Sequence, residues 1–282
     1  MAYYHVYTKG LEDREIFRDR DDFIMGMTLV AVVAFKIDVR VLAFVLMSNH
    51  VHFVLYGTMP QCKKFITKYK MLTGKWIAGK YNLNHFLKHL PTQLILIEDE
   101  EQLLETIAYI DRNSIVAGYS LLPGEYPWGS ARYLFKAKSI QDVRLLSEIK
   151  KKQLRRLLNT CTHLPLDWKI DADNMILPDC FLDIEHIEHL FKSPARYLYH
   201  LSKKLEGKVE MLEGTKAFIP DKELRTLVEG LSEQLFGKRD VKLLDFNSRI
   251  ILARKLRYGY ASTPKQISRM VYLADDVLTK FI

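Results

Sequence analysis

The chain has 282 residues, 48% of them hydrophobic, which is enough for one large or two medium domains with packed cores and excludes general disorder. A formal net charge of +8 indicates a polyanionic partner, nucleic acid first. Three widely spaced cysteines exclude a disulfide framework and a zinc ribbon. Without a signal segment or an apolar run long enough to span a bilayer, we expect a soluble, cytoplasmic protein with no membrane partner.

The first half of the chain alternates strand and helix patterns. Runs of β-branched and aromatic residues predict strands at residues 3–9, 38–48, 50–57 and 92–99. Apolar periodicity and an acidic first turn predict helices at about residues 20–35, 61–81 and 99–113. Only Ser48 and Asn49 separate the second and third strands, which predicts a tight antiparallel hairpin. This order predicts an α+β fold with a ferredoxin-like antiparallel sheet and helices packed on it.

The pattern of residues in the sequence changes after the turn-rich segment 121–135. We therefore expect one domain over residues 1–137 and a mainly helical accessory region over residues 138–282. Residues 145–240 carry no motif that indicates a function. Residues 241–282 hold eight Lys or Arg against three Asp or Glu, and their pattern resembles a helix-turn-helix. A helical hairpin that only packs has the same pattern, so DNA binding and structural packing both stay open.

Two histidines interrupt the apolar stretch MSNHVHFVLYG. His50 and His52 are two residues apart on a predicted strand, so their side chains point to the same face. That spacing suits two imidazole ligands on one metal ion, and it equally suits two packed or surface histidines. On the following helix Tyr109 and Asn113 are four residues apart and share one face. They suit a hydroxyl and an amide ligand beside a metal, or a core tyrosine and a helix-capping asparagine.

Three blocks together resemble one family in order and spacing. They are YHVYTKGLEDREIFRDRDD at 4–22, LAFVLMSNHVHFVLYG at 42–57, and YIDRNSIVAGYSLLPGEYPWGSARYL at 109–134. Over roughly residues 1–135 the chain resembles the single-tyrosine HUH transposases of the IS-two-hundred-like class, especially the REP-associated tyrosine transposases. The resemblance implies the HUH transposase fold for this region.

The resemblance also implies a role for each matching residue. His50 and His52 match the metal ligands, Tyr109 the nucleophile, and Asn113 the expected third ligand. The sequence departs from the family at Ser114, where proline is usual, and in FLKHLPTQLIL, where many members carry a tryptophan–glutamine pair. Dimeric members of the superfamily can exchange tyrosine helices between subunits, so a homodimer is one expectation, and action of Tyr109 in its own site and in the partner's site both stay open.

The implied chemistry is cleavage and transfer of single-stranded or hairpin-forming DNA. Mg²⁺ or Mn²⁺ would neutralise the scissile phosphate, and Tyr109 would form a 5′-phosphotyrosine that preserves the phosphodiester energy. The reaction then needs no ATP, which agrees with the absence of a G-x-x-x-x-G-K-[ST] loop.

A basic segment with interleaved aromatics suits single-stranded DNA, although it suits a solvated amphipathic helix as well. The predicted DNA contacts there are Lys63, Lys64, Lys68, Lys70, Lys75, Trp76 and Lys80. In the C-terminal module they are Lys265, Arg269 and Lys280. Two other functions remain open: a DNA-binding regulator without catalysis, and a metal-dependent phosphohydrolase that uses water and not Tyr109.

Overall fold

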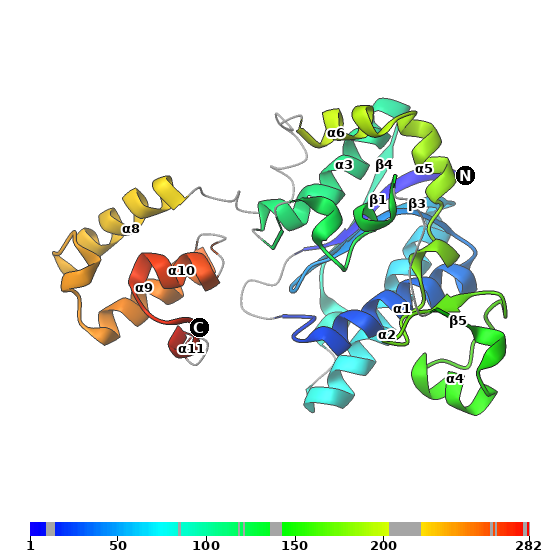
Figure 1. Cartoon of the computed structure of the whole chain (residues 1–282), viewed down its shortest axis with the longest axis horizontal. Coiled ribbons are helices and arrows are strands. Elements are labelled where there is room, and N and C mark those ends of the chain that lie inside the picture. Colours follow the sequence, from blue (N-terminus) through cyan, green and yellow to red (C-terminus); the bar gives the residue numbers. More distant parts are fainter. Residues whose placement is uncertain are drawn as a thin grey trace. The chain divides into compact units, whose positions relative to one another are not determined.

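The computed structural model describes residues 1–9, 15–83, 86–117, 119–120, 122–135, 143–202, 221–259, 262, 264–278 and 281. The chain divides into two compact units, which are described separately below (Figure 1). One unit comprises Met1–Asn113 with Leu122–Glu213, and the other comprises Ser114–Leu121 with Gly214–Ile282.

A four-stranded antiparallel sheet forms the centre of the first unit, so the predicted α+β class is confirmed. Its strands are β1 Ala2–Thr8, β2 Arg40–Leu46, β3 Val51–Gly57 and β4 Thr92–Ile97. They lie in the order β2-β3-β1-β4, and every neighbouring pair is antiparallel. The predicted hairpin joins β2 to β3, where the Met47 N–H donates to the His50 carbonyl at 2.9 Å across Ser48 and Asn49.

The two long helices begin and end at local signals in the sequence. Helix α1, Arg20–Ile37, starts at Asp19, whose carboxylate accepts from the Asp22 N–H at 3.1 Å, and it ends at left-handed Asp38 with φ 59°. Helix α2, Met59–Tyr81, opens with a capping box formed by Thr58 and Gln61. In the part of the chain that the structure describes, no helix combines the length and apolar character needed to cross a membrane.

The two faces of the sheet carry different helices. Phe53 on β3 packs against Phe65 and Tyr69 of α2, so α2 and its neighbour α1 cover one face. His52, the adjacent strand residue, points to the opposite face and contacts α3, Glu100–Val116. Figure 1 shows α3 with α5 and α6 on this second side of the sheet, away from α1 and α2.

The first unit continues past the expected boundary at residue 137. Its later elements are α4 Lys151–Leu157, α5 Ile184–Phe191, α6 Pro194–Ser202, and a small sheet of β5 Arg144–Leu145 with β6 Lys169–Ile170. Buried apolar residues of this segment, including Leu146 and Ile170, pack on Ala31 and Val32 of α1. The Asp183 N–H also donates to the Val41 carbonyl on edge strand β2 at 3.0 Å. This segment therefore completes the first unit instead of beginning a separate one.

The described part of the second unit is helical and has its own apolar core. Its helices are α8 Asp221–Phe236, α9 Phe246–Gly259, α10 Pro264–Val271 and α11 Asp275–Leu278. Leu224, Leu252, Leu256 and Ile267 are fully buried among them. Helices α10 and α11 occupy the predicted helix-turn-helix positions, and the described part of α11 is four residues long.

A buried carboxylate joins the start of α1 to the end of α2. Asp22, whose side chain is fully buried, lies 3.2 Å from the Trp76 indole nitrogen, 2.7 Å from the Tyr81 hydroxyl and 3.0 Å from the Lys80 ammonium. Asp19 accepts a second pair of contacts from Lys80, both at 2.7 Å. Removing the Asp22 carboxylate takes the acceptor from the Trp76 indole N–H and from the Arg18 backbone N–H, whereas Lys80 keeps its contacts with Asp19.

We predict that Asp22→Ala lowers the free energy of unfolding of this unit by about 3 kcal/mol, because a buried charged acceptor is lost that takes hydrogen bonds from the Arg18 N–H as well as from Trp76, Tyr81 and Lys80. Urea unfolding followed by tryptophan fluorescence measures it, since Trp76, Trp128 and Trp168 all lie in this unit. The matched control is Asp21→Ala, which removes an exposed carboxylate from the same turn and should change little. Equal effects of the two substitutions would contradict a structural role for the Asp22 network.

Candidate active site

The histidine pair lies at the start of β3 in the middle of the sheet. His50 and His52 are 7% and 1% exposed, and their ring centroids are 4.9 Å apart. The His50 Nδ1 lies 2.7 Å from the Asn49 Oδ1, a carbonyl oxygen that can only accept. His50 therefore carries its proton on Nδ1 and leaves a lone pair on Nε2. Among the described residues this buried Nε2 has no hydrogen-bond partner.

Helix α3 brings the predicted tyrosine and asparagine to the same place. The Tyr109 ring centroid lies 5.8 Å from that of His52, edge to face, and the residue is 6% exposed. Its hydroxyl is buried and has no hydrogen-bond partner within the described part of the chain. One turn further on, the Asn113 amide nitrogen donates to the Tyr109 carbonyl at 3.0 Å. The Asn113 side chain also interacts with His50.

Burial keeps the imidazoles neutral. It lowers the pKa of His50 to about 4, against a smaller opposite effect of the Asn113 side chain. Burial also lowers the pKa of His5 to about 3 and that of His52 well below its usual range. Neutral imidazole is the form that binds metal ions, so these side chains are in the state that metal binding requires at neutral pH.

The donor set suits a divalent cation. The lone pair of His50 Nε2 has no protein partner among the described residues, and the neighbouring amide of Asn113 offers an oxygen ligand. Across the described residues, no three or more His, Cys, Asp or Glu side chains are spaced to hold a metal. A cation bound here would therefore draw on the amide oxygen, and on oxygens from the substrate, to complete its coordination.

The sequence patterns did not single out two residues that lie near this site. His5 on β1 shares the face of His52, and its Nε2 lies 3.1 Å from the His52 Nδ1. Asp111 on α3 is 3% exposed, and its carboxyl oxygens lie 2.8 Å from the Ser130 hydroxyl and 2.7 Å from the Tyr197 hydroxyl. Burial raises the pKa of Asp111 to about 7. The alternation in YYHVY could have indicated that His5 faces the histidine pair, whereas nothing local marks Asp111.

The basic helix α2 lies on the face opposite the histidines. Lys63, Lys64 and Lys75 are exposed there, and Lys68 is half-buried. The Lys70 ammonium lies 2.5 Å from the Leu90 carbonyl, and burial lowers its pKa.

Lys80 and Trp76 contact Asp22, as described above, so they hold the fold together. Among the predicted DNA contacts on α2, the exposed lysines are thus the ones whose charges face solvent, and they do not line the histidine site.

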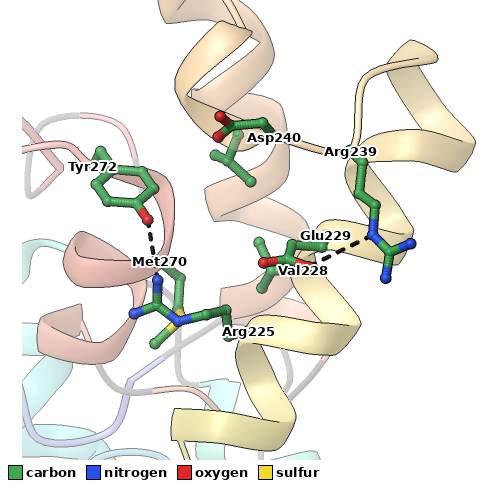
Figure 2. A pocket seen from close by; sticks show the side chains of 8 residues that line it. Arg225, Val228, Glu229, Arg239, Asp240, Met270 and Tyr272 are labelled. Carbon is green, nitrogen blue, oxygen red and sulfur yellow. Dashed lines mark hydrogen bonds and ion pairs between the residues drawn. The ribbon is translucent and has the colours of Figure 1, made fainter.

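Not all of the predicted DNA contacts in the second unit lie within the described residues. Arg269 is exposed on α10, Lys265 lies in the same helix, and Lys280 falls outside the described residues. A separate pocket of about 260 Å³ occurs in this unit (Figure 2). Its lining residues are Arg225, Val228, Glu229, Arg239, Asp240, Val241, Met270 and Tyr272.

The charged residues that line this pocket balance, with Arg225 and Arg239 against Glu229 and Asp240. Arg225 donates to the Tyr272 hydroxyl at 3.1 Å, and the Arg239 Nε lies 3.6 Å from a Glu229 carboxyl oxygen (Figure 2). The pocket therefore shows no surplus of one charge that would define a ligand.

Comparisons with known proteins assign neither a family nor a function to this chain. No protein-family model matches the chain, and no curated protein matches it. A solved structure of a REP-associated tyrosine transposase bound to a REP hairpin is similar over 50% of this chain and 88% of its own, with 12% sequence identity and a TM-score of 0.36. This likeness is too weak to support a functional assignment, which depends on the residues of the site.

We predict that His50→Gln reduces the acid sensitivity of the first unit. In wild type the His50 pKa rises from about 4 when folded to an ordinary 6.5 when unfolded, so stability present above pH 6.5 is lost as the pH falls toward 4. Between pH 7 and pH 5 this loss amounts to about 2 kcal/mol for one such histidine. Urea unfolding at the two pH values measures it.

The control for this prediction is His163→Gln, which removes an exposed histidine. It should lose as much stability between pH 7 and pH 5 as wild type does. If His50→Gln loses that amount too, His50 is not held neutral by burial.

Proposed function

We propose that the first unit is a ferredoxin-like HUH domain that cuts and rejoins single-stranded DNA through Tyr109. The element order β-α-β-β-α-β and the strand order β2-β3-β1-β4 support this fold plan. On this proposal the chain is a transposase-type DNA nickase and strand transferase whose partner is single-stranded or hairpin-forming DNA.

The observation that carries the proposal is the convergence of four residues from two distant segments. His50 and His52 come from the β2–β3 hairpin, and Tyr109 and Asn113 come from one face of α3. The 5.8 Å contact between the His52 and Tyr109 rings joins the two pairs in the interior of the unit. Packing alone gives no reason to bury an imidazole nitrogen and a phenol hydroxyl that bond to nothing in the described chain, because each such group costs about 1–3 kcal/mol.

The residues of the site have separate roles in this reaction. His50, His52 and Asn113 would hold Mg²⁺ or Mn²⁺, which, when bound, offsets the negative charge of the scissile phosphate and favours the phenolate. The Tyr109 oxygen attacks phosphorus and loses its proton to solvent. The bond from phosphorus to the 3′ oxygen breaks, and that oxygen takes up a proton, which leaves a 5′-phosphotyrosine and a free 3′-OH. Reversal by another 3′-OH rejoins the strand without ATP.

A DNA-binding regulator without catalysis is the second candidate function, favoured by the burial of the Tyr109 hydroxyl. A DNA strand can reach this hydroxyl only after the residues around it move. Ser114 also lies near the end of the helix, where the family that the chain resembles has proline. Cleavage therefore requires DNA binding to open the site, whereas a regulator would leave it closed.

We predict that wild type forms a covalent adduct with single-stranded hairpin DNA in the presence of Mn²⁺ and that Tyr109→Phe abolishes the adduct. The substitution removes only the hydroxyl from a buried ring, so folding and DNA binding should persist. Denaturing gels with labelled DNA, followed by mass spectrometry of the linked peptide, measure the adduct. Tyr119→Phe, which removes an exposed hydroxyl, is the matched control and should keep full activity.

The other functions give different results in the same assay. Binding without any adduct in wild type would indicate the regulator. Multiple-turnover hydrolysis that survives Tyr109→Phe would indicate the metal-dependent phosphohydrolase. Either outcome contradicts a tyrosine strand transferase.

We also propose that the exposed lysines of α2 contact the phosphate backbone. Replacing Lys63, Lys64 and Lys75 together by Gln should weaken binding of single-stranded DNA. The slope of log K against log salt should fall by about 2, because each neutralised phosphate contributes about 0.7. Fluorescence anisotropy at several salt concentrations measures the slope. The matched control replaces the exposed Lys150, Lys151 and Lys152, and an equal fall there would indicate general charge attraction only.

For the second unit we propose an accessory DNA contact through the region of α10 and α11. Exposed cations on α9 and α10, including Arg254, Lys255 and Arg269, support it. The acidic start of α11, Asp275 and Asp276, argues for backbone contact over base readout.

A further inference from the structure

A third histidine, His5, is built into the centre of the candidate site. It lies on β1 with 3% of its surface exposed, next to β3 in the sheet. Its Nε2 is 3.1 Å from the Nδ1 of His52, and the two rings are nearly parallel with centroids 5.3 Å apart. The Tyr7 ring packs against both imidazoles, at 4.8 Å and 5.4 Å, so their relative position is fixed on one side by an aromatic wall.

The hydrogen bond between these imidazoles has two forms with opposite consequences. Both rings are buried, and a neutral imidazole carries one N–H, so one ring donates to the other in this hydrogen bond. If His5 Nε2–H donates, the proton of His52 sits on Nε2, and that nitrogen cannot bind a cation. If His52 Nδ1–H donates to His5, the lone pair of His52 lies on Nε2. Only the second form makes His52 a metal ligand.

We propose that His5 is a positioning residue that accepts the Nδ1 proton of His52 and so presents the His52 Nε2 to a divalent cation. This inference rests on the proposed metal site. Ligating histidines generally donate their second nitrogen to an acceptor that fixes the tautomer and ring orientation. Asn49 does this for His50 at 2.7 Å, and His5 does it for His52 from the neighbouring strand.

The geometry argues against His5 as a further ligand. The Nε2 of His5 is occupied by the bond to His52, and within the described residues no three histidines are spaced to share a metal. His5 also lies beside the nucleophile, with its ring centroid 6.0 Å from that of Tyr109. Its replacement would therefore disturb His52 first and Tyr109 only through packing.

The test is a titration of the full chain with Mn²⁺ alone, read by electron paramagnetic resonance of the free ion. His5→Phe fills the space but cannot accept, and we expect it to weaken Mn²⁺ binding by about 10- to 100-fold. His5→Gln places an amide oxygen near the position of Nε2 and should bind Mn²⁺ within about threefold of wild type, on the same reasoning. His186→Phe removes a histidine that is hydrogen-bonded to Tyr3 and is the control without effect.

The outcomes separate this inference from the proposed function. If wild type does not bind Mn²⁺ at this site, the proposed metal site fails. If wild type binds and His5→Phe binds equally well, the metal site stands and the role of His5 is overturned. If His5→Phe does not fold, nitrogen-15 NMR of the wild-type imidazoles with Mg²⁺ decides: a proton on His52 Nδ1 supports the inference, and a proton on Nε2 overturns it.

Discussion

The candidate site depends on the orientation of helix α3 about its own axis as it packs against the sheet. Tyr109 and Asn113 face the histidines only while α3 keeps one orientation about its axis. Asp111 lies two residues after Tyr109, about 200° around the helix, and so points away from the histidines. Its carboxyl group is fixed by the Ser130 and Tyr197 hydroxyls, and Ser130 also accepts from the Phe44 N–H on β2 at 3.0 Å. The segments that follow α3 in the chain thus fix the helix on the side that faces away from the histidines.

A consequence is that the unit carries two kinds of buried titratable group with opposite responses to pH. The histidines disfavour protonation in the folded state, so their contribution to stability falls as the pH drops below 6.5. Asp111 has a folded pKa of about 7, raised by burial, and its contribution is complete at low pH and lost as the pH rises through 7. Because several imidazoles oppose one carboxyl group, acid should destabilise the site region overall.

The sequence predicted the elements of residues 1–116 well because their signals are local. Asp19 and Thr58 are helix caps, Ser48 and Asn49 fit a two-residue turn, and the four-residue spacing of Tyr109 and Asn113 places them on one face. The sequence could not show that Lys80 binds carboxylates about 60 residues earlier in the chain. Because of these contacts, Lys80 is not one of the cations of α2 that face solvent.

Long-range pairing also explains the features that were missed. His5 meets His52 only through the β1–β3 register, in which Tyr7 lies opposite His52. The domain boundary expected at 137 followed a change in composition. The apolar residues that return residues 143–202 to the first unit, such as Leu182 and Phe191, are spaced too thinly to predict a shared core.

The central claim is that the hairpin imidazoles and the α3 amide form one cation site beside the Tyr109 hydroxyl. Anomalous X-ray diffraction from crystals soaked in Mn²⁺ tests it most directly. We expect one strong peak within coordination distance of His50 Nε2, His52 Nε2 and the Asn113 amide oxygen, with the Tyr109 hydroxyl facing the same ion. Manganese bound only elsewhere, with these side chains unchanged, would contradict it.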